Sequence, residues 1–391
     1  MNNVWLGCSA GLGSGGLGGH LDFVYRAALE GGVSPHVYCR EAPARAGFTS
    51  IPSPSWQRYV KYTPLRWKPS AHVYMGAVQF DKAVADAMPG VQAVYHSFPA
   101  FAEESFARVR RHSGINVLEA ATTHVHELYA STMLEHRKFR MSGEPFSRPW
   151  VKRVLREYEL ADYITVASKL QWDTFVQHGV PEHKLLFAPL GVDTSRFAPI
   201  EGQPSRRSRE KGEPFRIIAV GQVSLLKGFP YLLEAVLSLK DPDVEITLFG
   251  GVGWRGIRQL VETYRRQGLN IGVASGDPLP ALHRSHLCVH ASVSDGFGLA
   301  PLEAMAAGLP VVVTEGTGMK DAIENGRNGF VVPARDAAAL AERLAELKEN
   351  EALRMAIGSA ARETALGYDV SRKVSEYAKL LLPIWNLSKS S

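Results

Sequence analysis

Short apolar runs alternate along the chain with longer segments in which apolar residues recur every three or four positions. The longer segments predict amphipathic helices, the last of them over Asp369–Leu387. Strands that alternate with helices indicate βαβ units and parallel sheets, so we predict an α/β protein. The short runs predict buried strands at Val4–Cys8, Val91–Tyr95, Ile115–Leu118, Tyr163–Ala167, Ile217–Val220, Glu245–Phe249, Leu287–His290, Val311–Thr314 and Gly329–Val332.

A polar segment without apolar periodicity, residues 199–214, divides this pattern into two halves. It contains charged residues, proline and glycine, as linkers between domains do. With 391 residues, the chain is too long for one ordinary core. We therefore predict two Rossmann-like, doubly wound domains, residues 1–198 and 215–368. We expect them to face a cleft, because such sheets bind ligands at the carboxyl ends of their strands.

Composition excludes several classes of protein. Hydrophobic residues make up 45% and charged residues 21%, which is typical of a globular chain and not of a disordered one. No apolar run approaches the ~20 residues that span a bilayer, and the first ten residues lack the pattern of a signal peptide. Three cysteines, Cys8, Cys39 and Cys288, share no metal-binding spacing, so we expect a reducing, cytoplasmic location.

Positive charge gathers in one part of the first half. The residues Ile51–Phe80 include no Asp or Glu, and basic residues alternate there with aromatic ones. Such a segment suits an anionic acceptor, a glycan or a membrane surface, which the protein would contact peripherally. Nucleic acid is not expected as a partner, because the net charge is only +5 and no binding motif accompanies the segment. A loop whose aromatic residues pack on their own domain is the alternative. The residues concerned are Arg58, Lys61, Arg66, Lys68, Trp56, Tyr59, Tyr62, Trp67 and Tyr74.

A glycine-rich segment, Gly11–His20, follows the first predicted strand. Glycines at this place let backbone N–H groups approach a phosphate at a helix N-terminus. Dinucleotide-binding domains use a similar segment for NAD and place an acid about 20 residues further on. Glu41 fits that position, so an NAD-dependent oxidoreductase is one alternative function.

Two further motifs follow predicted strands of the second half. Gly221–Gly228 places Lys227 just before a predicted helix, where its ammonium is a counter-charge for a diphosphate. In the second motif, Asp295 and Glu303 bracket a glycine-containing turn and the start of a helix. The N–H groups of Gly298 and Leu299 favour an anion there. The two carboxylates suit the hydroxyls of a sugar or a ribose.

Together these motifs resemble those of the retaining glycosyltransferases of group 1, also called family 4, which have the GT-B fold. The resemblance covers most of the chain and is densest over Phe215–Val332. The family's E-x7-E signature is similar to Asp295-x7-Glu303, its G-R-x4-K-G loop to Gly221–Gly228, and its glycine-rich loop to Gly15–His20. The chain departs from the family pattern twice: Asp295 stands in place of Glu, and Gln222 in place of Arg.

This resemblance implies a hexosyltransferase-type enzyme that moves a sugar from a nucleotide-diphosphate sugar to an acceptor hydroxyl. The acceptor would be a glycan, glycolipid or small glycoside held by the N-terminal domain, onto which the helix over residues 369–391 would cross back. The implied catalytic residues are His124, with His126 in reserve, Lys227 and Asp295. A GT-B nucleotide-sugar epimerase or binding protein is a second alternative. The implied donor-binding residues are Gly15, Gly16, Gln222, Lys227, Phe297, Gly298, Leu299 and Glu303.

We expect no metal and no cofactor besides the nucleotide-sugar co-substrate. His124, His126 and Glu127 lie close together in the sequence, but no further ligand has a suitable spacing. Residues 241–243, Asp-Pro-Asp, have the form of a D-x-D metal motif. They stand between a predicted helix and a predicted strand, where Asp and Pro are typical of a turn.

Overall fold

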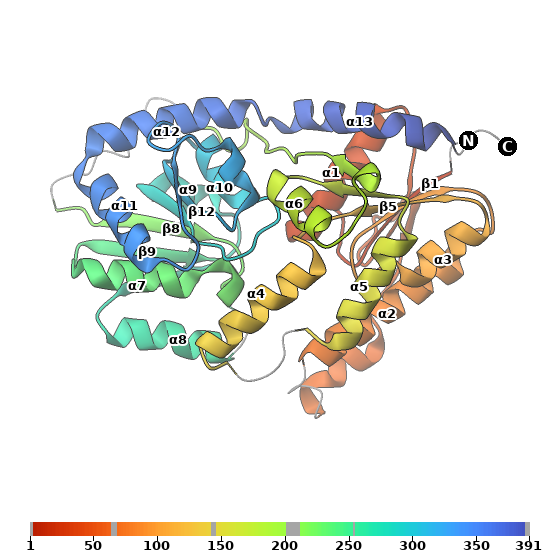
Figure 1. Ribbon diagram of the computed structural model, residues 1–391, viewed down its shortest axis with the longest axis horizontal. Coiled ribbons are helices and arrows are strands. Elements are labelled where there is room, and N and C mark those ends of the chain that lie inside the picture. The colour runs from red at the N-terminus through yellow and green to blue at the C-terminus, as the bar shows by residue number, and fades with distance from the viewer. Residues whose placement is uncertain (1–2, 64–68, 142–145, 201–211, 253–254, 388–391) are drawn as a thin grey trace. The chain divides into compact units, whose positions relative to one another are not determined.

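The computed structural model describes residues 3–63, 69–141, 146–200, 212–252 and 255–387. The chain forms two compact units (Figure 1). Unit 1 contains Met1–Met133, Gly143–Leu190 and Ser371–Ser391, and unit 2 contains Leu134–Ser142 and Gly191–Val370. The main division thus lies before the linker predicted at 199–214, of which residues 201–211 lie outside the described part of the chain.

Unit 1 is built on a seven-stranded parallel sheet with the order β3-β2-β1-β4-β5-β6-β7. The order reverses between β1 and β4, which are neighbours. The strands are β1 (Val4–Cys8), β2 (His36–Cys39), β3 (Phe48–Ser50), β4 (Val94–Ser97), β5 (Ile115–Glu119), β6 (Tyr163–Val166) and β7 (Leu185–Phe187). β1 and β4 are buried along their whole length, as helix-covered strands of a parallel sheet must be.

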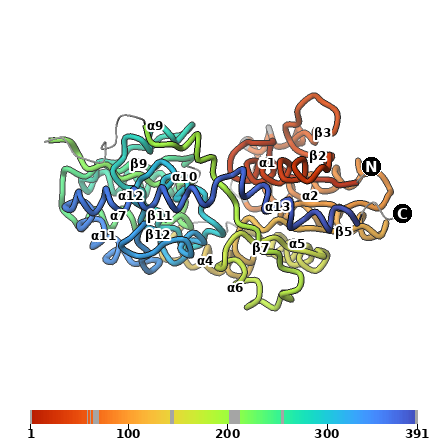
Figure 2. Tube along the Cα trace, turned by 90° about the horizontal axis from the view of Figure 1, so that it is seen from above, coloured from red at the N-terminus to blue at the C-terminus, as the bar shows by residue number. Residues whose placement is uncertain are grey.

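Helices cover both faces of the unit 1 sheet. α1 and α13 lie side by side on one face, and α2, α3 and α5 lie on the other (Figures 1 and 2). Phe23 of α1 packs edge-on against Tyr377 of α13, with ring centroids 5.4 Å apart. The helices are α1 (Gly15–Glu30), α2 (Pro69–Ala87), α3 (Glu103–Arg111), α4 (Val125–Lys138), α5 (Arg148–Leu160), α6 (Lys169–Gln177) and α13 (Val370–Asn386), with the 3-10 turns η1 (Ser55–Tyr62) and η3 (Glu182–Lys184).

Unit 2 has a six-stranded parallel sheet with the order β10-β9-β8-β11-β12-β13. This order reverses between β8 and β11. The strands are β8 (Phe215–Val220), β9 (Val244–Phe249), β10 (Asn270–Ala274), β11 (Leu287–His290), β12 (Val311–Thr314) and β13 (Phe330–Val332). The helices are α7 (Phe229–Leu239), α8 (Arg255–Arg266), α9 (Leu279–Arg284), α10 (Leu299–Ala306), α11 (Ala337–Glu349) and α12 (Glu351–Leu366), with the turns η4 (Leu225–Lys227) and η5 (Gly318–Ala322).

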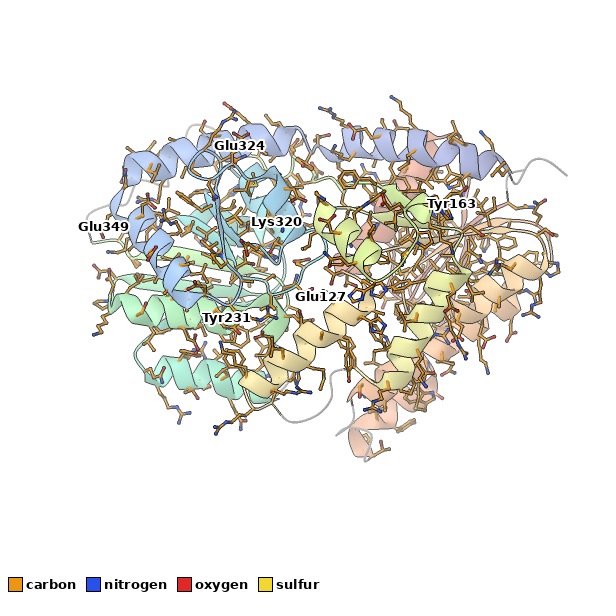
Figure 3. The ribbon with its side chains drawn as sticks, in the orientation of Figure 1. Glu127, Tyr163, Tyr231, Lys320, Glu324 and Glu349 are labelled. Atoms are coloured by element: carbon orange, nitrogen blue, oxygen red, sulfur yellow. The ribbon has the colours of Figure 1, made fainter. Side chains whose placement is uncertain are left out.

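Helix α4 starts in unit 1, and its last residues belong to unit 2. Within unit 2, the buried Glu135 carboxylate accepts hydrogen bonds from the Tyr231 hydroxyl (2.7 Å) and from Nε of Arg335 (2.6 Å). Tyr231 projects from α7 (Figure 3). These contacts explain why a short stretch after Met133 packs with the second unit, which the sequence pattern did not predict.

The predicted α/β architecture with two Rossmann-like sheets is confirmed, and most predicted strands are found within a residue or two. The prediction of a strand over Val91–Tyr95 was shifted, because Val91 is exposed and the strand begins three residues later. The chain turns at Asp241–Asp243 as predicted, and the Asp243 N–H donates to the Asp241 carboxylate (2.9 Å). Among the described residues, no helix is long and apolar enough to cross a membrane.

Candidate active site

The loops that follow β8 and β11 are bound to each other at the point where the strand order of unit 2 reverses. The Val293 N–H donates to the Leu226 carbonyl across this junction (2.8 Å). Gly228 has a left-handed backbone (φ +65°), and a Cβ there would lie 1.7 Å from the Ala291 carbonyl oxygen. Only glycine permits this close approach. Open α/β sheets bind ligands at such a reversal, so we place the candidate site here.

Two of the predicted site residues, Lys227 and Asp295, contact each other at this junction. Nζ of Lys227 lies 2.5 Å from Oδ2 of Asp295, and Nε2 of the buried His290 lies 2.7 Å from the same oxygen. Burial alone would raise the pKa of Asp295, but Lys227 and His290 together hold it well below its usual range. Burial also lowers the pKa of His290. At neutral pH Asp295 is therefore an ionised carboxylate and His290 a neutral imidazole.

The backbone around Asp295 is fixed by the loop that follows β12. The Asp295 N–H donates to the Gly316 carbonyl (2.8 Å), and its carbonyl accepts from the Gly318 N–H (3.1 Å). The Phe297 carbonyl accepts from the Met319 N–H (2.6 Å). The side chain of Phe297, one of the predicted donor-binding residues, is buried. The loops that follow β8 and β12 thus hold Asp295 in place.

Gly298, with φ +96°, precedes the first residue of α10, which is Leu299. The first N–H groups of a helix have no partner within the helix and favour an anion. Glu303 lies on this helix, and no hydrogen bond reaches its carboxylate within the part of the chain that the structure describes. Burial raises the pKa of Glu303 to about 7; Arg196 opposes the shift. Among the described residues, the Glu303 carboxylate is thus a hydrogen-bond acceptor without a donor, and it lies near the start of α10.

Gln222, the residue in place of the family's Arg, is exposed. Together with Lys227 and His290 it lines a small cavity between β8 and β11. A larger groove of about 500 Å³ begins at Gly250, at the carboxyl ends of β9 and β10. Gly250, which lines the groove, packs closely against Gly221, which lines the small cavity: a Cβ on Gly250 would lie 2.0 Å from the Gly221 carbonyl oxygen. The loop Gly221–Gly228 and the groove are therefore neighbours.

In unit 1, the glycine-rich segment forms the turn between β1 and α1. Gly15 is exposed and left-handed (φ +63°), whereas Gly16 has an ordinary backbone. Apart from the residues next to Gly16 and the backbone of its own helix, no atom of the described residues lies within 4 Å of the place that a Cβ on Gly16 would take. Ser14 precedes α1, but its hydroxyl donates to the Gly11 carbonyl (2.7 Å) and does not cap the helix. The side chain that usually satisfies the first helical N–H groups is therefore engaged elsewhere.

His124 lies just before α4 and is almost fully buried. Its ring stacks on that of His178 with centroids 4.5 Å apart, and its Nδ1 accepts from the His126 N–H (3.3 Å). Burial and these two histidines lower the pKa of His124 to about 3. His124 is therefore a neutral imidazole with its proton on Nε2, able to donate a hydrogen bond but not to act as an acid. His126, the reserve residue, is exposed.

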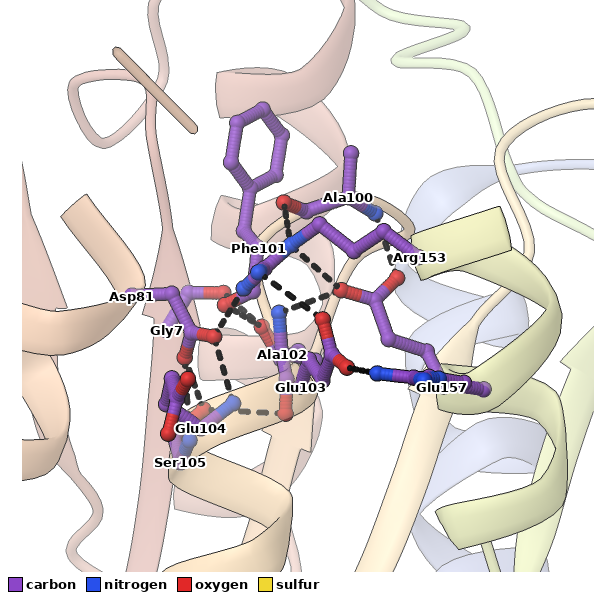
Figure 4. A network of polar contacts seen from close by, with 12 residues as sticks. Gly7, Asp81, Ala100, Phe101, Ala102, Glu103, Glu104, Ser105, Arg153 and Glu157 are labelled. Atoms are coloured by element: carbon purple, nitrogen blue, oxygen red, sulfur yellow. Dashed lines mark hydrogen bonds and ion pairs between the residues drawn. The ribbon is translucent and has the colours of Figure 1, made fainter. Parts of the chain in front are cut away.

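A buried ionic cluster holds the turn that follows β4 in unit 1 (Figure 4). Arg153 of α5 donates to Asp81, to Glu103 (3.0 Å) and, through Nε, to the Ala100 carbonyl (3.0 Å). Glu157 accepts from the Ala100 N–H (2.6 Å). Ala100 has φ +80°, an unfavourable conformation for a residue with a Cβ. The four charged residues come from three helices, and no sequence motif pointed to them.

A second buried cluster, around Glu119 at the end of β5, ties α13 to the sheet of unit 1. The carboxylate accepts from Nδ1 of His96 (2.7 Å) and from the Tyr377 hydroxyl (2.5 Å), and Nε2 of His20 lies 3.5 Å away. The Trp385 indole donates to His96 (2.8 Å). His20 and His96 thus have structural partners. Within the described ranges, no group of three or more potential ligands has the geometry of a metal site.

Comparison with proteins of known structure gives the class of the fold. Sucrose-phosphate synthase from Thermosynechococcus elongatus superposes with a TM-score of 0.76 at 19% identity, over 98% of this chain and 100% of that one. HepE from Anabaena, solved in complex with UDP, gives a TM-score of 0.68 at 17% identity, over 97% and 99%. These likenesses show the fold alone, which is the GT-B fold of glycosyltransferases.

The family is given by the sequence. Residues 203–364 match the model of the family described as glycosyl transferases group 1. The chain therefore carries a group 1 glycosyl transferase domain, as its motifs indicated. It is 32% identical over 207 residues to a D-inositol 3-phosphate glycosyltransferase from Salinispora arenicola, which is 47% of this chain and 46% of the relative. The chain spans about half the length of the curated relatives it matches.

Proposed function

We propose that the protein is a retaining glycosyltransferase that moves a sugar from a nucleotide-diphosphate sugar to an acceptor hydroxyl. The observation that carries this proposal is the grouping at the strand reversal of unit 2. There a cation, an ionised carboxylate and an unpartnered carboxylate adjoin the N-terminus of α10. Cations and helix N–H groups suit a diphosphate, and carboxylates suit vicinal hydroxyls.

The chemistry follows from charge. When the anomeric C–O bond to the diphosphate breaks, negative charge grows on the leaving phosphate. Lys227 and the N–H groups of Gly298 and Leu299 stabilise that charge without having to reorganise. Asp295 accepts hydrogen bonds from the donor sugar, and Glu303 accepts them from the ribose. The groove beyond Gly250 has room for the base.

Unit 1 contributes backbone N–H groups and a neutral hydrogen-bond donor to the binding of the nucleotide sugar. The N–H groups at Gly15 and Gly16 add further hydrogen bonds to the diphosphate, and Nε2–H of His124 donates to a sugar hydroxyl. We propose that the leaving phosphate takes the proton of the acceptor hydroxyl, so that attack occurs on the face that the diphosphate leaves. The three cysteines are free and buried, which supports a reducing, cytoplasmic compartment.

Product analysis tests this function. The full chain is incubated with UDP-, GDP-, ADP- and dTDP-sugars and candidate glycan or glycoside acceptors, UDP-glucose first because HepE was also solved with it. We expect release of a nucleoside diphosphate together with a glycoside whose anomeric configuration matches the donor. An inverted product would refute the retaining mechanism. Reversible conversion of the donor without transfer would favour an epimerase, and NADH turnover would favour an oxidoreductase.

We also predict that sugar transfer survives chelation of metals. Lys227 and the helix N–H groups provide positive charge at the diphosphate, the role that a divalent cation has in other transferases. Rates measured in EDTA should equal those measured without it. Loss of activity in EDTA that Mn²⁺ or Mg²⁺ restores would overturn this expectation.

The affinity for the donor should depend on pH through Glu303. Burial raises the pKa of this group to about 7, and a carboxylate accepts two hydroxyl hydrogen bonds only when it is ionised. Binding should therefore tighten about tenfold from pH 6 to pH 8. The phosphates of a nucleotide sugar do not titrate in this range. Calorimetry with wild type and Glu303→Gln measures the effect; equal pH dependence of both would exclude Glu303 as its source.

A further inference from the structure

The segment Ile51–Phe80, in which basic and aromatic residues alternate, is described only in part. Membrane contact through this segment stays a prediction, because its basic side chains are not among those described. Outside the described residues lie Arg66, Trp67 and Lys68, together with the side chains of Arg58 and Lys61.

The groove that begins at Gly250 in unit 2 is lined by apolar and by charged side chains. Val261 of α8 and Val273 of β10 line it, and Val273 is 42% exposed although it belongs to a strand of a parallel sheet. Such a groove suits a flat ring that is apolar on its faces and polar at its edge, as a nucleobase is. The charged side chains that line the groove all belong to α8: Arg258, Glu262 and Arg265.

Glu262 is held in place by Arg265. Nη1 of Arg265 donates to Oε1 of Glu262, and Nε and Nη2 of the same guanidinium donate to the Ile271 carbonyl (3.1 and 2.8 Å). Within the described ranges, no hydrogen bond reaches Oε2 of Glu262. The guanidinium thus ties the carboxylate to β10 and leaves one of its oxygens available to a ligand in the groove.

Arg258 adds a hydrogen-bond donor to the same groove. Its Nε and Nη2 donate to the Val252 carbonyl (3.4 and 3.3 Å). Nη1 of Arg258 donates to none of the residues that the structure describes. A guanidinium stays protonated in proteins, so Nη1 is always a donor. The groove therefore offers a ligand both a charged acceptor and a charged donor.

Of the common bases, guanine matches this pair of charged groups best. Its N1–H and N2–H groups stand side by side and can both donate to one carboxylate, while its O6 and N7 accept from a guanidinium. Uracil and thymine have a single N–H between two carbonyl oxygens, and the amino group of adenine stands next to an acceptor nitrogen. A carboxylate that faces one of these bases meets an acceptor as well as a donor, which weakens binding.

We propose that this groove selects guanine, so that the donor of the transfer reaction is a GDP-sugar. Glu262 accepts hydrogen bonds from N1–H and N2–H of the base, and Arg258 donates to O6. Val261 and Val273 contact the ring. The inference rests on the proposed function, because it assigns the base of the nucleotide sugar to the groove beside the loop Gly221–Gly228.

Calorimetry with nucleoside diphosphates tests this selection on the unaltered full chain. GDP should bind more tightly than UDP, ADP and dTDP. It should also bind about tenfold more tightly than inosine diphosphate, which differs from GDP only in lacking the 2-amino group. Equal affinities for GDP and inosine diphosphate would overturn the proposed contact between N2 and Glu262.

Glu262→Gln tests the carboxylate itself. The carboxamide keeps the size of the side chain but replaces one acceptor oxygen by a donor. The affinity for GDP should fall about tenfold, whereas that for UDP should stay the same or rise, because an amide pairs with N3–H and a carbonyl oxygen of uracil. The control is Glu346→Gln, which should change neither affinity. Glu346 also pairs with an arginine one turn away, Arg343 on α11, and it is not among the residues that line the groove.

If UDP, ADP or dTDP binds more tightly than GDP, the choice of guanine is overturned while the proposed sugar transfer stands. If Glu262→Gln binds GDP as tightly as the wild type does, the role of Glu262 is overturned. Binding of UDP by this variant shows that it is folded. If the wild type binds none of these nucleotides, both the guanine site and the proposed function are contradicted.

Discussion

Replacing Lys227 by alanine is expected to lower the kcat/KM for sugar transfer by about 10–150-fold and to leave the fold intact. The ammonium is the cation at the strand reversal of unit 2, and it also pairs with Asp295. Its loss removes a charge-assisted contact to the leaving phosphate, whose negative charge is greatest in the transition state. The Asp295 carboxylate keeps its contact with His290, which helps to hold the loop in place.

The control for this substitution is another lysine paired with an aspartate. Lys169 contacts Asp173 (2.7 Å) on the surface of α6. Neither residue is one of the proposed site residues, so Lys169→Ala should change neither kcat nor KM. Lys227→Arg keeps the charge and should retain more activity than Lys227→Ala. Near wild-type kcat/KM in Lys227→Ala would contradict the assignment of the diphosphate site.

Replacing Arg153 by alanine is expected to destabilise unit 1 by about 3–5 kcal/mol, because it leaves buried carboxylates without their cation. Asp81 and Glu157 are fully buried and both contact Arg153. For a domain of this size the loss corresponds to a fall in Tm of roughly 6–20 °C. Calorimetric or circular dichroism melting curves measure it. Arg156, close by on the same helix but 70% exposed, also pairs with Glu103, so Arg156→Ala is the matched control and should leave Tm nearly unchanged.

The destabilisation should depend on pH in a defined direction. Burial raises the pKa of Asp81 and raises that of Glu157 to about 8, while Arg153 opposes both shifts. Without Arg153 the two pKa values rise further, and the folded state then favours protonated carboxyls. The stability that these two protonated carboxyls contribute is present at low pH, and it is lost as the pH rises through their pKa values in the folded state. Arg153→Ala should therefore cost less at pH 5 than at pH 8; the same loss at both would refute this explanation.

The sequence was sufficient to predict the elements that carry the unit 2 site. β11 and β12 are buried along their whole length, β8 is buried in its centre, and the turns that follow them contain the glycines of the motifs. Four strands, β2, β3, β7 and β10, were not predicted. β2 is internal and buried but only four residues long, whereas β3, β7 and β10 are edge strands, and Ile271 is the one buried residue of β10. An edge strand needs no continuous apolar run, so its pattern is faint.

Contacts between distant segments were beyond prediction. In the sequence His290 is only the end of a predicted strand, and its hydrogen bond to Asp295 depends on the path of the loop between them. The cluster around Arg153 joins α2, α3 and α5, and Glu135 joins α4 to unit 2 through Tyr231 and Arg335. Each of these partners is a common polar residue, and only the packing of the helices brings them together.

Thermal unfolding of the full chain with nucleotide sugars tests the central claim most directly. A donor at 100 times its Kd should stabilise the protein by ~2.7 kcal/mol, which raises Tm by about 5–11 °C. We predict such a shift with at least one sugar of UDP, GDP, ADP or dTDP, a much smaller shift in Lys227→Ala, and none with NADH. No shift with any of these nucleotide sugars, or a shift with NADH alone, would contradict the account.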